Sequence, residues 1–107
     1  MFEVSDVRTL RNFVSYLVLH APNSFPREDF LAEADQMTLD KAFALIRNGV
    51  NLLDANQSST QGRDDLDRLI AASYEAYKIG DRVKGAHLIQ DFRELALKRY
   101  RRNGLPE

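Results

Sequence analysis

The chain has 107 residues, of which 44% are hydrophobic and 29% are charged, with a formal net charge of −1. A chain of this length and composition is typical of one globular domain and is not compatible with general disorder. Because it contains no cysteine, it has no disulfide framework, no thiolate metal site and no cysteine nucleophile.

The charges are distributed unevenly along the chain. Residues 1–60 contain five Lys or Arg and eight Asp or Glu, whereas residues 61–107 contain ten and eight. The first part is therefore net negative and the second part net positive, which can orient a partner, while the acidic overall balance argues against a whole-surface affinity for nucleic acid.

The N-terminal residues do not resemble a secretory signal, because Glu3 and Asp6 occupy a region that would carry positive charge. The most apolar window, residues 13–19, is far shorter than the roughly 20 residues that cross a bilayer. We therefore expect a cytoplasmic protein with no membrane partner.

The first predicted helix has apolar residues at spacings of three and four, with Ser5 as its N-cap. Its apolar stripe consists of Val7, Leu10, Phe13, Val14, Leu17 and Val18. It should end near His20, because Pro22 disfavours helical geometry at the preceding residue.

A short helix is predicted in the turn-rich segment that follows, from Ser24 or Pro26 to about Asp35. One side of this helix would carry Phe30, Leu31 and Ala34.

The next helix is predicted to start after a Thr38 cap, with Leu39, Phe43, Ile46, Val50 and Leu53 on its buried side. The Asn48–Gly49 pair interrupts this pattern, and Gly49 should weaken the helix by about 1 kcal/mol relative to alanine. A polar loop, Asn56 to Gly62, follows.

Two further helices are predicted after this loop. The first begins with three aspartates, whose negative charges stabilise the positive N-terminal end of a helix dipole. Gly80 is predicted to end this helix. Asp81 caps the second, which should continue to Asn103–Gly104. Their buried residues would be Leu66, Leu69, Ile70, Ser73 and Tyr77, then Leu88, Ile89, Phe92, Leu95 and Ala96.

These elements predict an all-α fold: a small antiparallel bundle of four longer helices plus one short helix, in a single helical domain covering residues 1–107. The stretch from Tyr74 to Phe92 resembles the helix–Gly-Asp–helix hairpin of a tetratricopeptide repeat, which implies peptide recognition in that family. The copy expected 31 residues upstream would run into the loop at Asn56, so we interpret the stretch as an ordinary helical hairpin.

The basic end of the last helix is the strongest candidate for a binding site. It contains Lys98, Arg99, Tyr100, Arg101 and Arg102. Cations also favour the C-terminal end of any helix, so the cluster can be an ordinary helix terminus, a set of phosphate contacts or a contact to an acidic protein. Tyr100 could stack on a base, but packing on a neighbour with a solvated hydroxyl is more typical.

No motif indicates catalysis. His87 and Asp91 could supply only two metal ligands, and we interpret them as surface residues. The acidic residues Glu28, Asp29 and Glu33, with Asp35, are interpreted as a solvated face. The sequence contains no phosphate-binding loop, dinucleotide fingerprint or nucleophile elbow, so we expect no cofactor and no enzymatic activity.

We therefore predict a small helical protein-binding or regulatory module, such as an adaptor, a chaperone-like factor or an inhibitor or immunity-type protein, whose partner is another protein. One alternative is a nucleic-acid-binding protein that uses the basic C-terminal helix. The other is a self-associating structural subunit, a possible homo-oligomer. Its contacts would come from apolar residues outside the main stripes, namely Phe2, Leu19, Val83 and Leu97.

Overall fold

A computed structural model describes residues 3–55 and 62–101, and these ranges contain four α-helices, one 3-10 turn and no strand. The helices are α1 (Val7–His20), α2 (Leu39–Asp54), α3 (Arg63–Lys78) and α4 (Arg82–Arg101). The predicted all-α class and the four longer helices are confirmed. No helix within the described ranges is both long and apolar enough to cross a membrane.

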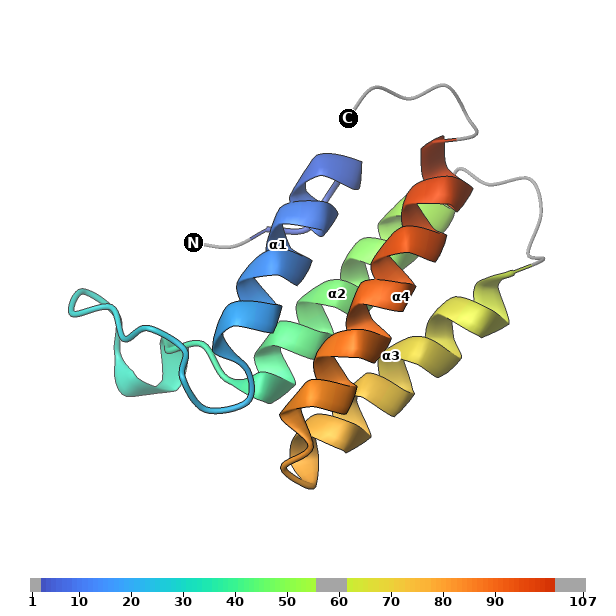
Figure 1. The fold of residues 1–107 in the computed structure, drawn as a ribbon. Helices are drawn as coiled ribbons and strands as arrows, with labels where there is room; N and C mark the ends of the chain where they lie inside the picture. The colour runs from blue at the N-terminus through green and yellow to red at the C-terminus, as the bar shows by residue number, and fades with distance from the viewer. Residues whose placement is uncertain (1–2, 56–61, 102–107) are drawn as a thin grey trace.

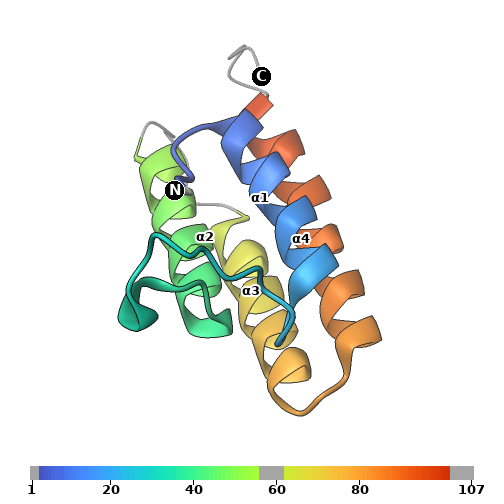
Figure 2. The same ribbon diagram turned by 90° about the vertical axis from the view of Figure 1, so that its left-hand side faces the viewer.

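The four helices form an up-and-down bundle in which each helix runs antiparallel to its neighbours (Figure 1). α1 packs against α2 and α4, and α3 packs against α2 and, most extensively, α4. The segment between α1 and α2, residues 21–38, leaves the end of α1 and crosses the side of the bundle before α2 begins (Figure 2). This segment is the largest departure from a minimal bundle within the described residues.

Side-chain caps fix three of the helix starts. Asp6, and not Ser5 as predicted, caps α1: its carboxylate accepts a hydrogen bond from the Thr9 backbone N–H at 2.8 Å, and the Thr9 hydroxyl accepts one from the Asp6 N–H. This reciprocal arrangement satisfies more backbone donors than a serine one residue earlier could. The predicted caps Thr38 and Asp81 are both present, on α2 and α4.

The predicted short helix is reduced to a single 3-10 turn, Glu33–Asp35. Phe30, predicted to share one side of this helix with Leu31 and Ala34, is 78% exposed. The Gln36 side chain explains the difference, because its amide forms two hydrogen bonds with the backbone of Glu28. It accepts one from the Glu28 N–H and donates one to the Glu28 carbonyl oxygen, both at 2.9 Å. A side chain that pairs with the backbone in this way competes with helical hydrogen bonding.

The core consists of one apolar stripe from each helix. Tyr77, Tyr100, Phe43, Phe92, Leu10, Leu17, Ile46, Leu66, Ile70, Ile89, Val14 and Val50 are its largest fully buried side chains. Most of the predicted stripe residues are buried, but Val18, Leu39, Leu69 and Leu88 are only half-buried and Leu95 is exposed.

Gly49 lies inside α2 without interrupting it. A Cβ atom at this position would lie 2.2 Å from Cγ1 of Val4, a residue that is itself buried. The glycine therefore allows the residues before α1 to pack closely on α2. A residue with higher helix propensity would have a Cβ atom, which this contact leaves no room for.

Two sequence predictions lie outside the described residues: the end of the last helix at Asn103–Gly104, and the polar loop except for Gly62. Gly62 and Gly80 both have positive φ, of 92° and 90°, and Gly80 joins α3 to α4 as predicted.

Candidate functional site

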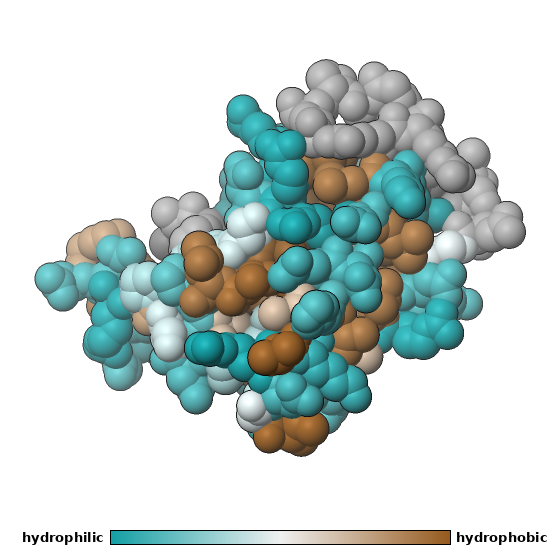
Figure 3. All heavy atoms as spheres, viewed as in Figure 1, coloured by the Kyte–Doolittle hydropathy of each residue, from teal (hydrophilic) through white to brown (hydrophobic). Residues whose placement is uncertain are grey.

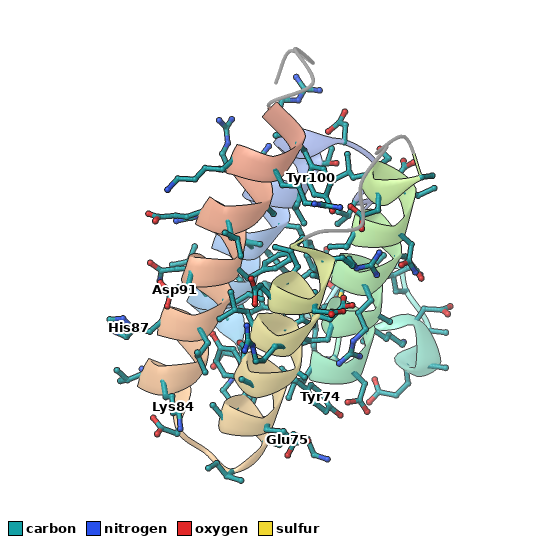
Figure 4. The ribbon with its side chains drawn as sticks, turned by 90° about the vertical axis from the view of Figure 1, so that its right-hand side faces the viewer. Tyr74, Glu75, Lys84, His87, Asp91 and Tyr100 are labelled. Carbon is teal, nitrogen blue, oxygen red and sulfur yellow. The ribbon has the colours of Figure 1, made fainter. Side chains whose placement is uncertain are left out.

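Two residues of the predicted basic site at the end of α4, Arg99 and Tyr100, are engaged in internal contacts. Tyr100 is only 1% exposed and points from α4 toward α2 (Figure 4). The Arg99 side chain is mostly buried, Lys98 is exposed, and Arg101 is the last residue of the helix. Arg102 lies outside the described residues.

Asp54, at the end of α2, joins three helices. Its Oδ1 accepts hydrogen bonds from the Tyr100 hydroxyl at 2.7 Å and from Nε of Arg99 at 3.0 Å, and its Oδ2 accepts one from Nη1 of Arg63 at 2.8 Å. The side chain of Asp54 is 13% exposed. The expectation that the Tyr100 hydroxyl would face solvent is wrong, because this carboxylate gives it a buried acceptor. We refer to Asp54, Arg63, Arg99 and Tyr100 as the Asp54 cluster.

The electrostatics of the Asp54 cluster favour an ionised carboxylate and a neutral phenol. Burial alone would raise the pKa of Asp54, but the hydrogen bonds from Tyr100, Arg63 and Arg99 outweigh it and hold the pKa below its ordinary value of 3.8. Burial, with the hydrogen bond to Asp54, raises the pKa of Tyr100 above its ordinary value of 10.0. Arg99 and Tyr100 therefore have a structural role that leaves little of either side chain for a phosphate or a base.

The lowered pKa of Asp54 predicts a pH dependence of stability. Because its folded pKa lies below the ordinary value of 3.8, the carboxylate stabilises the fold above that value, and this contribution is lost as the pH falls through the folded pKa. We expect the free energy of unfolding, measured by urea denaturation, to decrease below about pH 4. Hydrogen bonds from Thr9 and Arg27 also lower the pKa values of Asp6 and Glu33.

The variant Asp54→Asn separates the contribution of Asp54 from those of the other acids. The difference in unfolding free energy between the wild type and this variant should shrink as the pH falls from about 5 to about 2. A difference that is independent of pH would show that the charge of Asp54 does not stabilise the bundle.

The side of α4 that points away from α3 carries Lys84, His87 and Asp91 (Figure 4). All three are exposed, as expected for surface residues. Within the described parts of the chain, no group of three or more His, Cys, Asp or Glu side chains is arranged to hold a metal ion.

A second candidate site is built by segment 21–38. The Gln36 amide, which pairs with Glu28, also donates to the Leu31 carbonyl at 3.0 Å, and its side chain is buried. Lys41, in the first turn of α2, donates from Nζ to the carbonyl oxygens of Gln36, at 2.9 Å, and Ala34. These bonds hold an irregular segment in one conformation beside α2.

A groove of about 520 Å³ lies between this segment, α1 and α2. Half-buried Tyr16, Leu31, Met37 and Leu45 contribute much of its apolar surface, and the exposed Phe30 also lines it. Other lining residues are Pro26, Glu28, Asp35, Lys41, Ala44 and Asn48. A mostly apolar concave site with a few polar groups at this volume is typical of binding pockets. We refer to it as the segment groove.

The sequence prediction missed the segment groove. The acidic residues expected to be a solvated face are exposed, but two of them, Glu28 and Asp35, line the groove. The position of Phe30 in the sequence was a usable signal, since a large aromatic residue among prolines and acids fits a surface binding segment.

Of the residues proposed for self-association, Leu19 and Val83 are exposed, Leu97 is half-buried and Phe2 lies outside the described residues. On the face that α1 and α4 present, hydrophilic side chains divide the apolar surface into separate patches (Figure 3). This face therefore does not show one continuous apolar surface.

No model of a known protein family, no curated protein and no solved structure matches this chain. The functional argument therefore depends on the segment groove and the surface around it.

Proposed function

We propose that the protein is a small cytoplasmic helical module that binds another protein and has no catalytic activity of its own, as an adaptor, a chaperone-like factor or an inhibitor would. The segment groove is the binding site in this proposal, and the observation that carries it is the exposed Phe30 beside an apolar hollow of about 520 Å³. The absence of cysteine fits the proposed cytoplasmic location.

A protein segment suits this site better than a small molecule. Pockets for small ligands bury about 70–90% of the ligand surface among inward-facing side chains. Phe30 is instead 78% exposed, so most of its ring remains in water until a larger surface covers it. Aromatic residues that become buried on association contribute a large share of the binding energy in protein interfaces.

Selection from a random dodecapeptide library displayed on phage tests this function. We expect the wild type to enrich peptides whose affinity, measured by fluorescence anisotropy, falls at least tenfold in Phe30→Ala, because truncation of a central aromatic hot-spot residue costs about 2 kcal/mol or more. Since Phe30 is so exposed, the variant should keep the melting temperature of the wild type.

Ile79→Ala is the matched control, because Ile79 is also 78% exposed but lies in the turn between α3 and α4. This variant should bind the selected peptides within about twofold of the wild type. If no peptide is enriched, or if the two variants lose affinity equally, the segment groove is not the binding site.

The two alternatives receive less support. Nucleic-acid binding would have to proceed with Arg99 and Tyr100 already bonded to Asp54. Self-association has Leu19 and Val83 available, but the apolar patches on the viewed face are separate (Figure 3).

A further inference from the structure

The charges around the segment groove are unbalanced. Residues 21–38 contain one cation, Arg27, and four carboxylates. Arg27 forms an ion pair with Glu33, at 2.6 Å, so three carboxylates, those of Glu28, Asp29 and Asp35, have no ion-pair partner among the described residues. Two of these three, Glu28 and Asp35, line the groove.

Among the residues that the structure describes, Lys41 is the one cation that lines the groove, and its ammonium group already makes two hydrogen bonds. It donates to the backbone carbonyls of Ala34 and Gln36. Lys41 therefore holds the segment in place and neutralises neither Glu28 nor Asp35 by a direct ion pair.

The charge of Glu28 acts on the groove wall. Burial raises the pKa of Tyr16, and the negative charge of Glu28 raises it further. The groove wall beside Tyr16 therefore lies in the negative potential of Glu28, which attracts a cation.

We propose that the segment groove binds a basic segment of another protein, in which one or two large apolar side chains stand next to Lys or Arg. This inference rests on the proposed function. The apolar side chains enter the hollow beside Tyr16, Met37 and Leu45, and the cationic groups face Glu28 and Asp35. Complementary charge at the rim gives such an interface its specificity and a faster association rate.

The composition of the selected dodecapeptides is the first test. Among peptides whose binding depends on Phe30, we expect Lys and Arg to be enriched beside Leu, Phe or Trp, and Asp and Glu to be depleted. Replacing the Lys and Arg residues of such a peptide by Glu should abolish its binding. The affinity of the original peptide should fall as the salt concentration rises, because exposed charge pairs are screened.

Charge variants of the protein provide the second test. The double variant Glu28→Gln, Asp35→Asn should weaken binding of the selected basic peptides about fivefold, the effect expected from the loss of two exposed charge pairs. The matched control is Asp91→Asn, Glu94→Gln, which removes the same charge from exposed positions on α4. The control should bind within about twofold of the wild type.

The outcomes distinguish this inference from the function on which it rests. Phe30-dependent peptides that are neutral or acidic, or an equal loss of affinity in the two charge variants, would overturn the basic partner and leave the groove as a binding site. The absence of any Phe30-dependent peptide would overturn both. Concentration-dependent dimerisation that Phe30→Ala abolishes, measured by sedimentation velocity, would assign the groove to a second copy of this chain and overturn the basic partner.

Discussion

Replacing Asp54 by alanine is expected to lower the free energy of unfolding by about 3 kcal/mol. The side chain is 13% exposed and accepts hydrogen bonds from α3, through Arg63, and from α4, through Arg99 and Tyr100. Alanine would remove the acceptor that the phenol of Tyr100 and the guanidinium groups of Arg63 and Arg99 share, although Arg63 would keep its bonds to Asp67 and Asn51. Equilibrium urea denaturation at neutral pH measures this loss.

Asp67→Ala is the matched control for Asp54→Ala, because Asp67 also accepts from Arg63, at 3.0 Å, but is half exposed and lies four residues away on the same helix. Surface pairs of this kind contribute about 0–1 kcal/mol. If the free energy of unfolding falls equally in the two variants, the Asp54 cluster does not stabilise the packing of the helix ends.

Two tyrosines give a second comparison within the same experiment. Tyr100→Phe should lose about 1 kcal/mol, since it removes the buried hydrogen bond to Asp54. Tyr77→Phe should lose little, because the Tyr77 hydroxyl is buried without a partner among the described residues. Equal losses in these variants would show that the hydroxyl of Tyr100 contributes through packing alone.

The burial of Tyr100 could have been predicted from the sequence. Ile89, Phe92 and Ala96 are fully buried on α4 at spacings of three and four residues, and Tyr100 follows Ala96 by four. Its acceptor could not, because Asp54 is 46 residues away and no local pattern reports which helix ends meet. Periodicity thus identifies the face of a helix, whereas the partners at its end depend on how the whole bundle closes.

The segment groove was harder to predict for a related reason. The spacing of Phe30, Leu31 and Ala34 fits one side of a helix, and this local preference led to the short-helix prediction. Hydrogen bonds from Gln36 to the backbone of Glu28 and Leu31 override it. These bonds join residues five and eight positions apart through a side chain, and Lys41 of α2 holds the same segment, so the spacing of apolar residues does not report them.

Gly85→Ala is the second variant for which we expect a large effect, a loss of about 1–3 kcal/mol. Helix propensity alone would favour alanine over glycine by about 1 kcal/mol. The added Cβ, however, would lie 2.8–2.9 Å from Cγ, Cδ2 and Cε2 of the Tyr77 ring. That ring is buried and packs edge to face on the ring of Phe43, with 6.2 Å between the ring centroids, so it has little room to move.

The backbone at Gly85 is also unable to retreat from the ring, because its carbonyl accepts a hydrogen bond from the buried Ser73 hydroxyl at 2.7 Å. Thermal or urea unfolding measures the net effect, and Ala71→Gly, at an exposed position of α3, measures helix propensity alone as a loss of about 1 kcal/mol. If the added Cβ overpacks the crossing, Gly85→Ala should lower the free energy of unfolding, although the higher helix propensity of alanine would by itself raise it. A rise in stability would mean that α3 and α4 can separate at this crossing at little cost, and that the ring of Tyr77 does not determine their distance.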